Sequence, residues 1–171
     1  MKVRKDVWLS SIGVGLFTLI FSLISSGFGL WMGAAAFIAA SYFFGAGSPM
    51  DKLANISVSF ILGIMWGALS TWLFTFPHLH DLWPSAFIFG FLTFLVLFLQ
   101  GTIMPFTEVP AWLIAWGTTM LIVSNLPIDD WFVFGVELVI CMYLGIFLII
   151  LGSAYFSKVI NRLINKSPDH Q

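Results

Sequence analysis

Charge is the scarcest feature of this chain, because only 9% of its 171 residues are Asp, Glu, Lys or Arg. A soluble domain carries roughly 25% charged residues, which give it a polar surface toward water. Hydrophobic residues make up 60% of the chain, and the mean hydropathy is +1.01. The composition therefore excludes a water-soluble globular fold and indicates that lipid surrounds much of the protein.

Several kinds of chemistry lack the residues that they need. The formal net charge is −1, so the chain has no basic surface for nucleic acid. The one cysteine, Cys141, cannot form an internal disulfide. No glycine-rich phosphate loop, nucleophile elbow or HExxH zinc motif is present. We therefore expect no enzyme, no cofactor and no nucleic-acid partner.

One loop contains side chains that can ligate a metal, namely His78, His80 and Asp81. Their spacing matches no recognised metal site, and a fourth ligand is missing. We interpret this segment as a hydrated loop and expect no metal.

What the chain has instead is long apolar segments, separated by glycine, proline and polar residues. A membrane-spanning helix needs about 20 mostly apolar residues. We therefore predict an all-α fold, a polytopic membrane bundle of about six transmembrane helices in one domain, residues 1–171. Pro105 and Pro110 interrupt the fifth segment, which is expected to form a broken or re-entrant helix. The expected spans are 7–26, 30–44, 54–76, 84–99, 105–124 and 131–156, followed by a basic cytoplasmic tail at 157–171.

Small residues mark the expected contacts between helices. The second span is rich in alanine, and Gly63 and Gly67 form a small-xxx-small pattern in the third. Such residues let helix backbones approach closely in lipid. We expect both features to face other helices, and for the two glycines a contact within the chain is favoured over dimerisation.

The distribution of cations predicts the orientation. If the N-terminus lies inside and six spans alternate, all seven Lys and Arg fall on one side of the membrane. Asp81, Asp129 and Asp130 fall on the other side. Short loops rich in Lys and Arg stay in the cytoplasm, so both termini are predicted to be cytoplasmic. The seven cations are Lys2, Arg4, Lys5, Lys52, Lys158, Arg162 and Lys166.

The segment 48–53, Ser-Pro-Met-Asp-Lys-Leu, is followed by Ser57, Ser59, Gly63 and Trp66-Gly67. In these residues, and in the proline-rich start of the fifth span, the chain resembles a family of bacterial inner-membrane proteins, domain of unknown function 1097. The resemblance implies a fold and the bacterial inner membrane, but no activity. A fainter resemblance links 104–111 to the Leu-Pro-x-x-Thr-x-Pro-Phe signature of urea transporters, of whose pattern only the prolines and their spacing match.

Two carboxylates fall inside expected spans, Glu108 at the proline-broken start of the fifth and Glu137 in the sixth. A carboxylate in hydrocarbon costs at least ~2.5 kcal/mol, so such residues usually face a cavity or a partner. No cation lies within a span, so neither glutamate has an obvious buried partner. Both glutamates could line a solute path. Alternatively, both lie close enough to span ends to reach water, and Glu108 could cap a helix N-terminus. Candidates to join the path are Gln100, Thr102, Thr107, Thr118, Thr119 and Asn125, with Asn55 and Ser59 as weaker additions.

The predicted function is a small-solute channel or transporter subunit, and the predicted partners are the lipid bilayer, further copies of the chain in a homo-oligomer and a small polar solute. A single six-helix chain of this size has little room for a pore of its own. The alternative is a membrane interaction or accessory subunit that does not transport.

Overall fold

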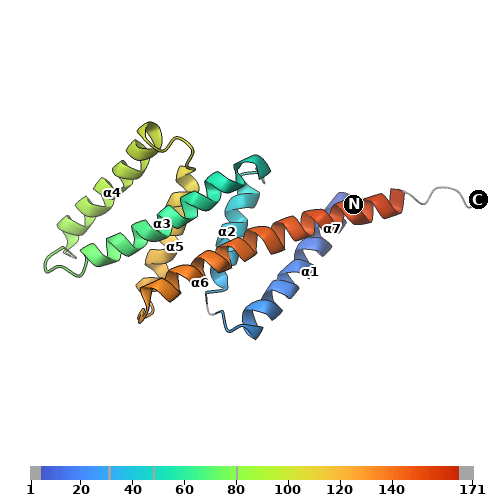
Figure 1. Ribbon diagram of the computed structural model, residues 1–171, viewed down its shortest axis with the longest axis horizontal. Helices are drawn as coiled ribbons and strands as arrows, with labels where there is room; N and C mark the ends of the chain where they lie inside the picture. Colours follow the sequence, from blue (N-terminus) through green and yellow to red (C-terminus); the bar gives the residue numbers. More distant parts are fainter. Residues whose placement is uncertain (1–4, 31, 48, 80, 166–171) are drawn as a thin grey trace, which may run out of the picture. The chain divides into compact units, whose positions relative to one another are not determined.

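The computed structural model describes residues 5–30, 32–47, 49–79 and 81–165, without the side chains of residues 5, 6 and 165. Over this part of the chain all regular structure is helical, which confirms the all-α prediction (Figure 1). The elements are α1 (Lys5–Gly27), α2 (Ala34–Gly45), a 3-10 turn η1 (Met50–Lys52), α3 (Leu53–Leu73), α4 (Leu82–Thr102), α5 (Val109–Val123), α6 (Trp131–Leu144), a π-helical segment η2 (Gly145–Leu151) and α7 (Gly152–Asn165). Of the residues singled out above, Lys2, Arg4, Ser48, His80 and Lys166 lie outside the described residues.

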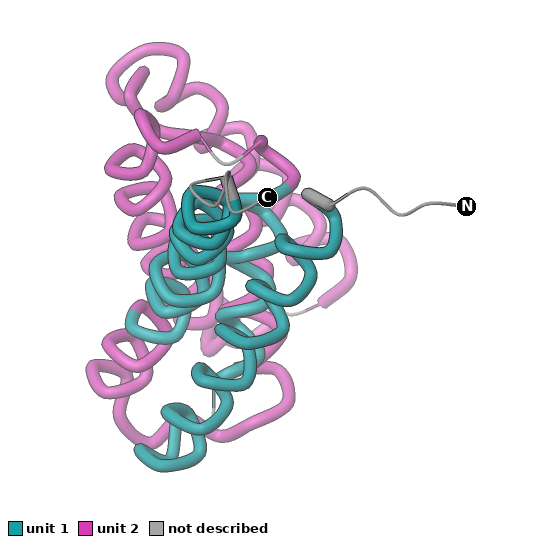
Figure 2. The backbone as a smooth tube through the Cα atoms, turned by 90° about the vertical axis from the view of Figure 1, so that its right-hand side faces the viewer, with its two compact units in different colours: residues 1–44, 140–171 teal, residues 45–139 magenta. Residues whose placement is uncertain are grey.

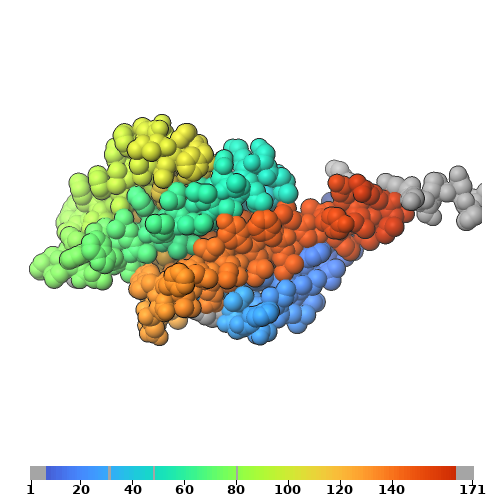
Figure 3. All heavy atoms as spheres, viewed as in Figure 1, coloured from blue at the N-terminus to red at the C-terminus, as the bar shows by residue number. Residues whose placement is uncertain are grey.

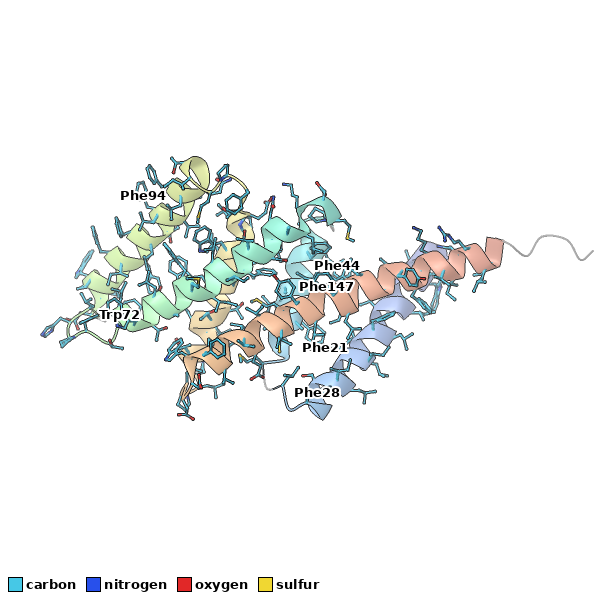
Figure 4. The ribbon with its side chains drawn as sticks, in the orientation of Figure 1. Phe21, Phe28, Phe44, Trp72, Phe94 and Phe147 are labelled. Atoms are coloured by element: carbon cyan, nitrogen blue, oxygen red, sulfur yellow. The ribbon has the colours of Figure 1, made fainter. Side chains whose placement is uncertain are left out.

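Among the described residues, four helical segments are long and apolar enough to cross a membrane, and two further apolar helices are shorter. The long segments are Val7–Gly27, Met50–Leu73, Leu82–Thr102 and Trp131–Ile164, and the short ones are Ala34–Gly45 and Val109–Val123. Large apolar side chains stand exposed along the helices, such as Phe94 at 58% on α4 (Figure 4). Lipid accounts for such surfaces, and the chain is a multi-pass integral membrane protein.

Three helices differ from the predicted spans by four residues or more at one end, and one of them is α5, which begins at Val109 rather than at 105. The second helix begins at Ala34 rather than near residue 30, because the chain first makes a tight turn. In that turn the Leu30 N–H donates to the Ser25 carbonyl at 2.8 Å, and Gly29 has a φ of +65°, which favours glycine. The last helix continues from Gly152 to Asn165, through much of the predicted tail, since neither glycine nor proline interrupts residues 153–167.

The described helices gather into two compact units (Figure 2). Unit 1 comprises residues 1–44 and 140–171, and unit 2 comprises residues 45–139. In unit 1, α1 and α7 lie side by side (Figure 3). The short helix α2 presents buried alanines, and a Cβ added to Gly145 would lie 2.7 Å from the Ala36 carbonyl carbon. The π-helical segment η2 begins at that close contact.

Unit 2 is organised around α3 and α5, which make the largest helix contact in the described chain. The aromatic helix α4 packs on this pair through side chains. Its Phe89 ring lies 5.3 Å from the ring of Phe74, the residue that follows α3, and 5.9 Å from the ring of Trp116 of α5, between ring centroids. The Trp66 indole N–H donates to the Leu92 carbonyl of α4 at 3.3 Å.

Candidate functional site

The candidate site lies where α3 and α5 run side by side in the same general direction (Figure 1). The hydroxyl of Ser59 meets Glu108, and the hydroxyl of Thr71 meets the Met120 sulfur at 3.6 Å. Both pairs are 49 residues apart in the sequence. A constant separation of this kind requires a parallel pair, so α3 and α5 begin at the same end of unit 2.

Two glycines of α3 bring the backbones of this pair together. A Cβ added to Gly63 would lie 2.6 Å from the Ala115 Cβ and closer still to the Trp112 carbonyl oxygen. A Cβ on Gly67 would lie 2.5 Å from the Thr119 side chain. No ordinary side chain fits at such distances, so the small-xxx-small face of α3 lies against α5 within the chain.

The chain enters α5 through a compact polar turn. Thr107 is buried, and its hydroxyl donates to the Met104 carbonyl at 2.8 Å. The Glu108 backbone N–H donates to the Ser59 hydroxyl oxygen at 2.8 Å, and that hydroxyl donates in turn to the Asn55 carbonyl at 2.7 Å. The backbone N–H of Glu108, at the turn before α5, thus has its hydrogen-bond acceptor on α3. In lipid, every backbone polar group needs a partner of this kind.

Glu108 is the N-cap residue of α5, and its carboxylate pairs with a lysine. The Lys52 ammonium lies 2.9 Å from Glu108 Oε1, with the Glu108 side chain 24% exposed and the Lys52 side chain 52% exposed. No cation lies within an expected span, and the partner of Glu108 comes from outside the spans. Lys52 lies in η1, outside the expected spans, and its long side chain reaches the carboxylate.

Helix α5 begins beside the second turn of α3 rather than beside its first residue. Ser59 is the seventh residue of α3, so at 1.5 Å per residue Glu108 lies about 9 Å along that helix from its first residue. Helix α5 has 15 residues and is about 22 Å long, shorter than the ~30 Å hydrocarbon core. On its own, α5 is therefore shorter than a membrane crossing, and the ion pair and the polar turn lie at its start.

Further along the pair, indole groups fill the interface. The Trp116 indole N–H donates to the Ser70 hydroxyl at 3.0 Å in a buried position. Trp112 is fully buried beside Trp66, with ring centroids 5.4 Å apart and ring planes at 87°. Among the described residues, the Trp112 indole nitrogen has no hydrogen-bond acceptor. An unpaired buried donor costs about 1–3 kcal/mol, so this one calls for an explanation.

The other predicted path residues are dispersed. Thr118 is buried in α5, ten residues beyond Glu108, and its hydroxyl donates to the Ile114 carbonyl of its own helix. Gln100 is half-buried near the end of α4, and Glu137 is half-buried in α6. The structure thus brings Lys52, Ser59 and Thr107 to Glu108 at the start of α5, and it leaves the three other candidates on separate stretches of unit 2.

The two predicted prolines lie near the start of α5, and the loop with the potential metal ligands follows α3. Pro105 lies in the turn before α5, and Pro110 lies in its first turn, where the missing N–H costs nothing. In the loop after α3, His78 Nδ1 lies 3.6 Å from Asp81 Oδ2. Within the described residues no three potential metal ligands come together.

Lys52 and Trp116 are the site residues that the sequence reasoning missed. A signal for Lys52 was available, because the charge distribution already placed segments 45–52 and 100–110 on the same side of the membrane. No comparable signal marks Trp116, since tryptophans that form the interfacial belt and tryptophans in the helix contact look alike in the sequence.

Comparison with known proteins identifies one family. A profile of the family described as "Protein of unknown function (DUF1097)" matches residues 11–156. No curated protein and no solved structure matches the chain. The fainter likeness to urea transporters is not among the matches.

Proposed function

The chain belongs to the DUF1097 family, and we propose that it is a subunit of a small-solute channel or transporter in the bacterial inner membrane. The proposed topology has six spans with both termini in the cytoplasm, and the proposed assembly is a homo-oligomer. In this account the solute path passes the start of α5, beside Lys52 and Glu108.

The observation that carries the proposal is a local arrangement that occurs twice. The short helix α2 is second among the first three spans, and the short helix α5 is second among the last three. Each is held by a glycine of a long helix, since Gly145 approaches the Ala36 carbonyl group and Gly63 approaches the Trp112 carbonyl group. With six alternating spans, α2 and α5 would cross in opposite directions.

The sequences around these contacts also correspond. Ala35-x-x-Ile38-Ala39 aligns with Ala111-x-x-Ile114-Ala115 at a separation of 76 residues, which equates Ala36 with Trp112. Leu62-Gly63-Ile64 aligns with Leu144-Gly145-Ile146. Paired short helices in the corresponding positions of two halves are typical of transporters built from inverted repeats, which place their solute sites at such helices.

The polar groups of unit 2 support the same reading. In the six-span account, α5 starts at membrane depth with an ion pair, and irregular backbone at that depth is tolerated where it is buried or lines a cavity. The indole N–H of Trp112, one turn beyond Glu108, is a buried donor without an acceptor in the described chain. A passing polar solute would give this donor an acceptor.

The alternative, an accessory subunit without transport, is favoured by a different observation. Ser59 and Ser70 use their hydroxyl groups within the α3–α5 contact, as a packed structural interface would. On this view the Lys52–Glu108 pair only fastens the start of α5, and it adds about 0–1 kcal/mol to stability because it is partly exposed.

Flux measurements on the full chain in proteoliposomes test the proposal, with glycerol, urea and formate as probe solutes. We expect the protein to speed entry of at least one probe over protein-free liposomes. Glu108→Gln keeps the shape and removes the charge, so it should change that flux severalfold while the unfolding midpoint stays within a few degrees. Asp129→Asn, in an exposed loop, is the matched control and should leave the flux unchanged.

Two results would contradict the proposal. If none of the probes enters faster than in protein-free liposomes, the accessory role is the better reading. If flux occurs but Glu108→Gln and Asp129→Asn behave alike, the path does not pass the ion pair.

A further inference from the structure

Helix α1 begins and helix α7 ends at the same end of unit 1. The two helices are antiparallel neighbours, because a Cβ on Gly13 would lie 3.1 Å from the Ser153 carbonyl oxygen, whereas Gly152 approaches the Phe17 ring. In this antiparallel register, a residue nearer the N-terminus of α1 lies at the level of a residue nearer the C-terminus of α7. Lys158 therefore lies at about the level of Trp8, and Arg162 at about the level of Lys5.

This register collects positive charge at one end of unit 1. Lys158 and Arg162 are both exposed, and within the described residues neither has a carboxylate at ion-pair distance. In the sequence, Lys2 and Arg4 precede Lys5, and Lys166 follows Arg162 by four residues. In the sequence, six of the seven cations thus fall within residues 2–5 or 158–166, with Asp6 as the acidic residue that follows the first group.

One face of α7 combines these charges with an aromatic ring. Tyr155, Lys158 and Arg162 are spaced by three and four residues and so share a face. Tyr155 is 70% exposed, and Leu163, beside Arg162, is 61% exposed. Tyrosine is enriched at the headgroup level of membranes, whereas lysine and arginine reach past it to lipid phosphates.

Together, α6, η2 and α7 form one continuous helical segment, and its length brings this face to the membrane surface. Its apolar span covers 34 residues, Trp131–Ile164, where about 20 cross the hydrocarbon core. The α1 span begins at Val7, so the level of Lys158 and Arg162 coincides with the start of that span. The charges therefore lie where a span meets the headgroups.

We propose that Lys158 and Arg162 of α7 bind the headgroup of an anionic phospholipid. Lys and Arg close to a membrane surface attract acidic lipids, and each cation adds on the order of fivefold to affinity. The bound phosphate would relieve the repulsion between these two like charges, which lie one turn apart on α7. This site is in unit 1 and does not depend on the proposed transport.

Native mass spectrometry of the full chain in mild detergent tests the site, with phosphatidylglycerol and phosphatidylcholine as probes. We expect phosphatidylglycerol to bind more tightly, and Lys158→Gln/Arg162→Gln to lower its affinity roughly 20-fold. The charge-conserving pair Lys158→Arg/Arg162→Lys should retain binding. Lys52→Gln, which removes a cation of unit 2, is compared with Lys158→Gln and should leave binding unchanged.

Four outcomes would overturn the proposal. They are equal binding of the two lipids, unchanged affinity in the double Gln variant, equal losses in Lys52→Gln and Lys158→Gln, and displacement of the lipid by excess inorganic phosphate. The last would show a simple anion site rather than a lipid site. Unfolding curves for each variant separate loss of binding from loss of fold.

Discussion

At the scale of single residues, the α3–α5 contact depends on the absence of side-chain atoms at Gly63. A methyl group there would meet the α5 backbone at the Trp112 carbonyl. Backbone cannot move aside as the end of a flexible side chain can. The helices must therefore separate to accept the methyl group.

We predict that Gly63→Ala destabilises the protein by about 1–3 kcal/mol, the usual range for overpacking a tight interior. Gly90→Ala in α4 is the matched control, since a Cβ there meets no atom within 4 Å. Alanine is the better helix former, so this control should be neutral or more stable by up to about 1 kcal/mol. Unfolding of both variants in detergent, followed by circular dichroism, measures the difference, and equal stability would refute the contact.

Residue identity predicted the close approach but not the ion pair. Small-xxx-small spacing is a direct signal of backbone proximity, so the face with Gly63 and Gly67 could be read from the sequence. The partner of Glu108 could not be found by searching the spans for a cation, because Lys52 precedes α3 and extends to it. Because the lysine side chain is long and flexible, its charge can lie several ångströms from its backbone, beside a different helix.

At the scale of the helices, the parallel register of α3 and α5 is the feature with the clearest consequence. Their contacts keep a separation of 49 residues from Ser59 and Glu108 to Thr71 and Met120. The chain must return through α4 between them, so the turn before α3 and the turn before α5 meet at one end.

Cysteine cross-linking tests this register in a Cys141→Ala background. We predict that Thr71→Cys/Met120→Cys forms a disulfide on mild oxidation, since the two side chains touch at 3.6 Å. Thr71→Cys/Leu121→Cys is the control, because Leu121 is 62% exposed and faces away. Non-reducing electrophoresis after cleavage of an introduced protease site between α3 and α5 distinguishes the two. Efficient linking of the control pair alone would exclude the register.

Helix existence followed from hydropathy, whereas helix ends depended on local chemistry. The turn at Gly29 consumes residues that hydropathy assigns to the second span. At the other extreme, α7 continues past the apolar run because its polar residues, such as Lys158 and Arg162, stay on an exposed face. An amphipathic helix of this kind looks like a tail when only mean hydropathy is considered.

At the scale of the whole molecule, the proposed function depends on a six-span topology with all seven cations on the cytoplasmic side. The family match and the apolar helices establish a multi-pass membrane protein. The proposed path needs more than this, because it requires α3 and α5 to begin on the cytoplasmic side at Lys52 and Glu108. Two helices are shorter than a full crossing, so counting apolar residues alone leaves the number of crossings open.

Cysteine accessibility in intact cells tests that topology most directly. In a Cys141→Ala background, Asp129→Cys is expected to react with a membrane-impermeant maleimide added outside. Lys52→Cys is expected to react only after the membrane is permeabilised. Labelling of Lys52→Cys in intact cells would contradict the six-span account and the solute path that depends on it.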